Sequence, residues 1–146
     1  MANRQMHSMA ITDYGKQAVI FRPHREARLN RNFRTAFWTG EYFQITLMSI
    51  APGSEVGLEQ HKSTDQLLLI EEGAGLTMMG ESKNALGMQR LVRQGDAVIV
   101  PAGTWHNIKN IGKRPLKILS VYSPPEHPFG TIHKTKEDAD KAEQYS

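Results

Sequence analysis

The feature that most constrains this chain is a regular alternation of short strand-like segments with turns that contain glycine or proline. Segments of four to nine β-branched, aromatic or aliphatic-rich residues recur from residue 35 onward. They cover residues 35–38, 42–50, 66–70, 76–79, 97–100, 106–111 and 116–122. Turn sequences such as Thr39-Gly40 and Gln94-Gly95-Asp96 separate them. Many short strands with almost no helical periodicity predict an all-β sandwich or barrel.

Two further elements are expected outside this run. Residues 18–21 form an isolated strand candidate, and residues 135–138 read Thr-Lys-Glu-Asp, a capping-box-like start for a short polar helix. A chain of 146 residues has the length of one domain. We therefore expect a flexible N-terminus over residues 1–15, a barrel over residues 16–125, and a tail with a short helix over residues 126–146.

Composition excludes several classes of protein. The chain has no cysteine, which excludes disulfides, thiolate metal sites and cysteine nucleophiles. The longest aliphatic run, residues 67–70, is far too short to span a membrane, and residues 1–20 lack the apolar core of a signal peptide. These features predict a soluble, cytoplasmic protein that does not associate with membranes.

The distribution of charge argues against nucleic acid as a partner. The net charge is +3, but the sign alternates along the chain. Residues 1–34 have seven basic and two acidic side chains, residues 41–81 one and seven, and residues 82–117 seven and one. The densest basic feature is an arginine at every third position from Arg22 to Arg34, with no nucleic-acid recognition motif beside it. Such alternation favours complementary patches within a fold or between subunits.

Potential metal ligands occur in two separate segments. Glu59 and His61 are two residues apart, so they share a face in extended chain, and Gln66 begins the next apolar run. His106 starts a later strand, just after a turn with proline and glycine. Two imidazoles, a carboxylate and an amide oxygen form a mixed nitrogen and oxygen donor set. This set suits a divalent first-row metal ion: Zn, Mn, Fe, Ni or Co.

These two segments resemble the two signature motifs of the cupin superfamily. The second motif, G-x5-P-x-G-x2-H-x3-N, is present in full as Gly95, Pro101, Gly103, His106 and Asn110. The first, G-x5-H-x-H-x3–4-E-x6-G, is matched in spacing from Gly53 to Gly73, with Glu59 and Gln66 in place of the usual histidine and glutamate. The wider sequence also resembles small single-domain cupins described as mannose-6-phosphate-isomerase-like, for example in Pro101-Ala102-Gly103-Thr104-Trp105-His106-Asn107.

The resemblance implies a double-stranded β-helix, the jelly-roll barrel of cupins, with a divalent metal ion held by Glu59, His61, Gln66 and His106. Zn, Mn, Fe or Ni would be the ion. Compared with the family motif, the single carboxylate lies at Glu59 instead of at the position of Gln66. The ligand set therefore has the same charge as in the motif. The alternative is that Glu59 and Gln66 only hydrogen-bond across a barrel mouth that holds no metal.

The sequence is compatible with three functions. The first is an enzyme that isomerises or epimerises a small polar, sugar-like substrate, with Glu59, His127 and His133 as candidate catalytic residues. The tail histidines could instead pack or face solvent. The second is a metal-dependent dioxygenase, and the third is a sensor or binding cupin without catalysis. Small cupins are commonly dimers, so we expect a homodimer in which residues 18–21 cross to the other subunit.

Overall fold

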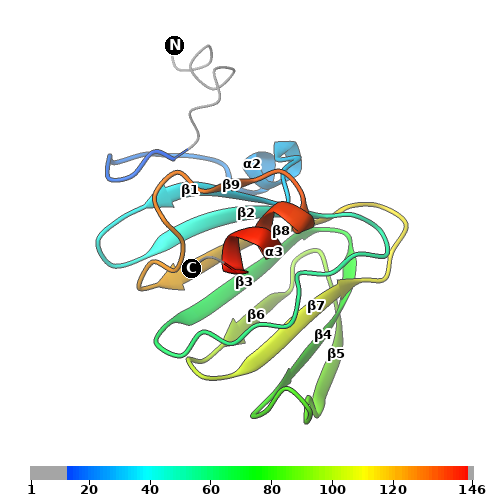
Figure 1. Cartoon of the computed structure of the whole chain (residues 1–146). Coiled ribbons are helices and arrows are strands. Elements are labelled where there is room, and N and C mark those ends of the chain that lie inside the picture. The colour runs from blue at the N-terminus through cyan, green and yellow to red at the C-terminus, as the bar shows by residue number, and fades with distance from the viewer. Residues whose placement is uncertain (1–12, 145–146) are drawn as a thin grey trace.

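Two antiparallel sheets form the body of the computed structural model, which describes residues 13–144 (Figure 1). The larger sheet has six strands in the spatial order β6 (Ala97–Val100), β3 (Asp65–Glu72), β8 (Leu116–Ser123), β2 (Gln44–Ile50), β1 (Arg34–Thr39) and β9 (Ile132–His133). The smaller sheet has the order β5 (Met88–Arg93), β4 (Ala74–Gly80) and β7 (Trp105–Asn110). The predicted all-β barrel is confirmed.

Side chains that alternate along the central strands form two separate apolar clusters. On β8, Ile118 belongs to the cluster between the two sheets, which also contains Leu68 of β3 and Ile108 of β7. The next residue, Leu119, points the other way and packs with Phe37 in a cluster on the outer face of the large sheet. Because successive side chains of a strand face opposite sides, one strand serves both clusters.

The interior of the barrel is apolar at one end and polar at the other. Along β2, Met48 and Ile50 join the internal cluster, while Gln44 lies at the far end of the same face and is fully buried. Gln44 and Gln66 flank Tyr122 in the strand register. Gln44 faces the interior, whereas the next residue of this strand, Ile45, packs on the outer cluster.

Two helices lie within the described residues. Helix α3 (Lys136–Gln144) was predicted, and the capping box is present: the Thr135 hydroxyl accepts from the Asp138 amide at 3.1 Å, and the Asp138 carboxylate accepts from the Thr135 amide at 3.3 Å. Helix α2 (Pro23–Leu29) was not predicted. Its buried residue, Ala27, packs on the outer cluster, so part of the arginine-rich segment is helical.

The prediction of a strand at residues 18–21 is wrong for the chain taken alone. These residues have no strand assignment, and Ile20 is fully exposed. Strand β5 was missed, because four of its six positions are exposed in succession and show no alternation. Residues 1–12 of the predicted flexible N-terminus lie outside the described residues.

We call the segment between β8 and β9, residues 124–131, the C-terminal strap. Asp13 anchors its far end, because the Asp13 carboxylate accepts from the Gly130 amide at 2.8 Å and from the Thr39 hydroxyl at 2.6 Å. The strap therefore crosses the polar end of the barrel between two fixed points. In the part of the chain described here, neither helix has the length and apolar character needed to cross a bilayer.

Candidate metal centre

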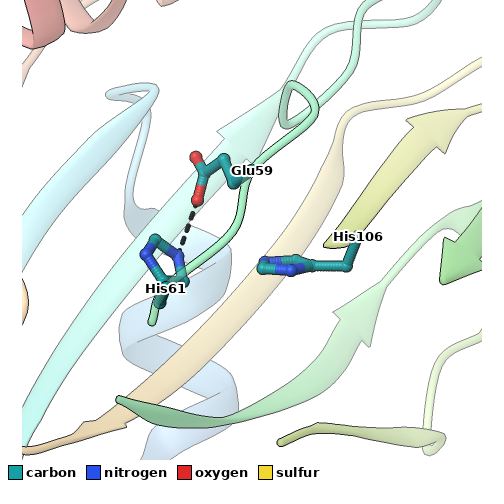
Figure 2. Close-up of side chains that lie close together, drawn as sticks. All are labelled: Glu59, His61 and His106. Atoms are coloured by element: carbon teal, nitrogen blue, oxygen red, sulfur yellow. Dashed lines mark ion pairs between the residues drawn. The ribbon is translucent and has the colours of Figure 1, made fainter. Parts of the chain in front are cut away.

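Three of the four predicted ligands meet at the polar end of the barrel. Glu59 and His61 come from the loop between β2 and β3, and His106 is the second residue of β7. Each of these side chains places a potential ligand atom within 4.8 Å of the others. Figure 2 shows the three side chains directed toward one another. The loop is held in place by paired backbone hydrogen bonds between Glu59 and His106, both 2.9 Å long.

The fourth predicted ligand, Gln66, lies beside this cluster. It is the second residue of β3, is 3% exposed and faces Tyr122 of β8 in the strand register. The Tyr122 ring is in turn 5.6 Å from the His61 ring. The strand register therefore places the Gln66 amide on the interior face next to the cluster.

Each histidine of the cluster has one ring nitrogen that contacts a group outside the predicted ligands and one that makes no hydrogen bond. The Nδ1 atom of His106 is 3.0 Å from the Thr104 carbonyl oxygen, which can only accept, so Nδ1 holds the proton. The Nδ1 atom of His61 is 3.3 Å from a carboxylate oxygen of Glu126. The Nε2 atoms of both rings are buried and have no hydrogen-bond partner. A second partner that fixes the ring and frees the other nitrogen is the usual arrangement of a metal-binding histidine.

Glu59 and Gln66, the two predicted ligands that would bind through oxygen, likewise have one side-chain atom in contact with a neighbour and one that makes no hydrogen bond. One carboxylate oxygen of Glu59, Oε1, is 3.5 Å from a guanidinium nitrogen of Arg34, while Oε2 is buried without a hydrogen-bond partner. The Gln66 amide nitrogen donates to the Ser120 hydroxyl at 3.4 Å, while the amide oxygen is buried and unpartnered. Buried polar atoms are rarely left without a partner. Four buried ligand atoms that make no hydrogen bond, one on each predicted ligand, therefore fit a bound cation.

The charges around the cluster favour a cation or a proton between Glu59 and His61. Their facing atoms, Oε2 and Nε2, are 2.8 Å apart, at ion-pair distance but not in hydrogen-bonding alignment (Figure 2). Burial opposes a charged His61 ring, but contacts with Glu126 and Glu59 outweigh burial and raise its pKa to about 9. Burial opposes ionisation of Glu59, but contacts with His61 and Arg34 lower its pKa. A metal ion would replace the proton on His61.

His106 differs from His61 in its ionisation. It is 2% exposed, and burial lowers its pKa below the usual value for histidine. The ring is therefore neutral near pH 7 and presents a lone pair at Nε2. A neutral imidazole is the form that binds a metal ion.

The C-terminal strap brings two further groups to the site. Glu126 contacts His61, as described, and also accepts a hydrogen bond from the Thr64 hydroxyl at 3.1 Å. The next residue, His127, stacks edge-on against Tyr122 with ring centroids 5.2 Å apart, and its Nε2 atom is buried and unpartnered. Burial, assisted by the charge of Arg34, lowers the pKa of His127 to about 3. His127 is therefore a neutral base candidate outside the predicted ligand set.

His133, the other predicted tail histidine, lies farther from the ligands. Its Nδ1 atom is 3.2 Å from an Arg34 guanidinium nitrogen, and its ring is 6.5 Å from that of His127. Because arginine can only donate, the Nδ1 atom of His133 must accept, so this ring carries its proton elsewhere. The structure thus assigns His133 a contact with Arg34 rather than with the ligand cluster.

Sequence reasoning missed Arg34 and Glu126. Arg34 is the last of the regularly spaced arginines and is the one that begins a buried strand, a placement that its spacing does not reveal. Glu126 follows two prolines in a segment without periodicity. Asp65, which precedes Gln66 in the sequence, accepts from the Ala102 amide at 2.8 Å and holds the turn before His106.

Comparison with known proteins gives a consistent result. Residues 46–122 match the family described as the cupin domain. The chain is 50% identical over 136 residues to the uncharacterized protein YrkC of Bacillus subtilis, covering 93% of this chain and 73% of that protein. An uncharacterized protein of Acanthamoeba polyphaga mimivirus is 32% identical over 117 residues, covering 80% of this chain and 71% of that protein. The crystal structure of BH2720 from Bacillus halodurans superposes with a TM-score of 0.89 at 47% identity, covering 90% and 99% of the two chains.

Proposed function

This chain belongs to the cupin family, and from that premise we propose that it is a metal-dependent enzyme that moves a proton on a small polar substrate, as sugar isomerases and epimerases do. The mannose-6-phosphate-isomerase-like subgroup is part of this proposal. The observation that carries it is the set of four buried ligand atoms that make no hydrogen bond, on Glu59, His61, Gln66 and His106. These residues would hold a divalent ion such as Zn, Mn, Fe or Ni.

The ion would act as a Lewis acid toward adjacent hydroxyl and carbonyl oxygens of a substrate. The residues around it would do the remaining work. Glu126 orients the His61 ring through its Nδ1 atom, and the Thr104 carbonyl does the same for His106. Glu59 was a candidate base, but its carboxylate is committed to His61, Arg34 and the ion. His127 is the candidate proton acceptor, because its Nε2 atom has no hydrogen-bond partner and its ring is neutral. Its pKa of about 3 makes it a weak base in the ligand-free protein.

A base that does not bind the ion distinguishes an enzyme from a sensor. A binding cupin needs ligands and a cavity but no group poised for proton transfer. The position of His127, which lies in the strap and packs edge-on against Tyr122, supports the enzyme. The identity of the ion distinguishes isomerisation from dioxygenation, because bound iron would favour dioxygenation.

The first experiment is elemental analysis of protein purified without chelators and without nickel-affinity steps. We expect near-stoichiometric metal in the native protein and in a His24→Ala control, which removes a half-exposed histidine of α2. The His106→Ala variant should lose the metal while remaining folded. An absence of metal from the native protein, even after reconstitution, would contradict the proposal and favour the sensor.

The second experiment tests proton transfer directly. The metal-loaded protein is incubated in D₂O with a panel of aldoses and ketoses, and deuterium incorporation into carbon-bound positions is followed by mass spectrometry. General acid–base groups contribute roughly 100-fold to 10,000-fold to a rate. We therefore expect His127→Gln to keep its metal and to lose exchange by about 100-fold or more. Equal exchange in the variant and the native protein would remove His127 from the mechanism.

A further inference from the structure

Arg34 is a buried cation beside the candidate metal centre. It is the first residue of β1, its side chain is 1% exposed, and it is among the largest fully buried side chains of the described residues. A guanidinium has five N–H donors and no acceptor, and it remains charged in proteins. Burial of such a group is costly unless negative partners engage those donors.

The contacts of Arg34 leave this requirement incompletely met. One terminal nitrogen, Nη2, is 3.5 Å from Glu59 Oε1, which is too long for a strong charge-assisted hydrogen bond. The other terminal nitrogen, Nη1, is 3.2 Å from the Nδ1 atom of His133, which offers a lone pair but no charge. The third nitrogen, Nε, is buried and has no hydrogen-bond partner.

The two acids of the site described above, Glu59 and Glu126, are already engaged elsewhere. Glu59 faces His61 at 2.8 Å and, under the proposed function, also binds the ion. Glu126 is 3.3 Å from the other nitrogen of the same ring and accepts from Thr64. A divalent ion at the cluster would add positive charge next to a guanidinium that still has an unused donor.

We propose that the site takes a small carboxylate-bearing ligand, whose carboxylate accepts a hydrogen bond from the Nε atom of Arg34 while its other oxygens reach the candidate metal centre. The planar fork of a guanidinium matches the two coplanar oxygens of a carboxylate. A neutral sugar would leave Nε without a charged acceptor. The contact of the ligand with the ion rests on the proposed function, whereas its contact with Arg34 does not.

A second observation agrees with an anion at this position. The charge of Arg34 contributes to the low pKa of His127, after burial. A carboxylate bound to Arg34 would offset that charge and make His127 a stronger base once the ligand is present. Ligand binding would thus prepare the neighbouring imidazole for proton transfer.

The test compares two ligands of the same size, glycolate and glycolamide, which differ in a charged carboxylate and a neutral amide. Both are titrated into manganese-loaded protein by calorimetry, and the metal content of each sample is measured. The native protein should bind glycolate at least tenfold more tightly than glycolamide. In Arg34→Gln this ratio should fall by about tenfold at unchanged metal content, because a hydrogen bond to a charged group is lost. An unchanged ratio would overturn the proposal.

Arg34→Lys provides a second variant if the glutamine variant does not fold. It keeps the charge but lacks the planar fork, so glycolate should still bind several-fold more weakly than to the native protein. Native-like glycolate affinity in this variant would overturn the role of Arg34. Inorganic phosphate is also tested as a competitor of glycolate. If phosphate displaces glycolate at a lower concentration than glycolate needs to bind, the site takes a phosphate and the carboxylate proposal is overturned.

The same measurements separate this inference from the proposed function. If the native protein holds no metal but binds glycolate in a manner that depends on Arg34, the metal proposal fails and the anion site stands. If metal binds stoichiometrically and glycolate shows no preference over glycolamide, the anion site fails and the metal proposal stands.

Discussion

The side-chain amide of Gln44 binds both backbone groups of His127, which is 83 residues away in the sequence. The Gln44 amide nitrogen donates to the His127 carbonyl at 2.8 Å, and the amide oxygen accepts from the His127 backbone N–H at 2.9 Å. The same oxygen accepts from the Glu126 N–H at 3.2 Å. One buried amide of β2 therefore fixes the strap residues that carry the candidate base and the partner of His61.

Replacement of Gln44 should destabilise the protein and loosen the strap. In Gln44→Leu, the backbone groups of Glu126 and His127 lose their buried partner, and each unsatisfied group costs roughly 1–3 kcal/mol. We expect a loss of about 2–4 kcal/mol in the free energy of unfolding, measured with urea. Gln89→Leu is the matched control, because Gln89 is exposed and should change stability by less than about 0.5 kcal/mol. Equal stability of the two variants would contradict the role of Gln44 in holding the strap.

Removal of Glu126 should weaken metal binding without abolishing it. Glu126 orients the His61 ring, and loss of such a partner typically lowers metal affinity by about 10-fold to 100-fold. We expect Glu126→Ala to bind one equivalent of metal at saturation with a Kd raised by about that factor, measured by competition with a chelating dye. Glu137→Ala, on the exposed side of α3, should retain native affinity. A native Kd for the Glu126 variant would show that the His61 ring needs no such partner.

Most of the barrel could be predicted because its signals are local. Strand β8 alternates between inner and outer clusters through Ile118 and Leu119, and the glycines of the second motif occupy turns at positive φ, as Gly95 and Gly103 do. Helix α2 could not be predicted because it buries only Ala27 and has no side-chain cap.

The candidate ligands could be predicted, whereas their surroundings could not. Spacing alone places Glu59 and His61 on one face and puts His106 after its turn. The role of Arg34 depends on which of five similar arginines the topology turns inward, and that of Glu126 depends on Gln44, 82 residues away. Such contacts arise from tertiary structure and leave no periodic trace in the sequence.

Gln66→Glu introduces the usual residue of the cupin motif. It should raise the affinity for metal and lower the stability of the metal-free protein. Gln66→Glu would put a charged oxygen where the structure has an unpartnered amide oxygen, so metal should bind at least about tenfold more tightly. Without metal, a carboxylate at a site that is 3% exposed should lower stability by about 1–3 kcal/mol. Both quantities are measured on the same preparation, by dye competition and by urea unfolding. If Gln66 does not bind the ion, stability should fall with no gain in affinity.

A homodimer remains our prediction for the assembly. Residues 18–21 were expected to cross to a second copy of the chain, and in the isolated chain they belong to no helix or strand, with Ile20 fully exposed and Val19 38% exposed. Exposed aliphatic side chains in a segment that pairs with no strand of its own chain suit pairing with the sheet edge of another copy. We expect a dimer in sedimentation experiments and dissociation in Ile20→Asp. Leu91→Asp, on β5 of the smaller sheet, is the control and should remain dimeric. A monomeric native protein would contradict the prediction.

The burial of His127 should make the protein sensitive to acid. Burial and Arg34 lower the pKa of His127 from 6.5 to about 3 in the folded state, so between these values only the unfolded chain takes up the proton. Stability from the neutral ring is complete above pH 6.5 and is lost by about 1.4 kcal/mol per unit as the pH falls toward 3. His127→Phe keeps an aromatic ring against Tyr122 but cannot be protonated.

We therefore expect the free energies of unfolding of the metal-free native protein and of His127→Phe to follow different pH profiles. Between pH 6.5 and pH 5, the native protein should lose about 1–2 kcal/mol more than the variant, measured by urea unfolding at each pH. Other titrating groups are common to both proteins, so their contributions cancel in the difference. Parallel profiles would show that the His127 ring takes up a proton as readily in the folded as in the unfolded chain, which would contradict the lowered pKa of this ring.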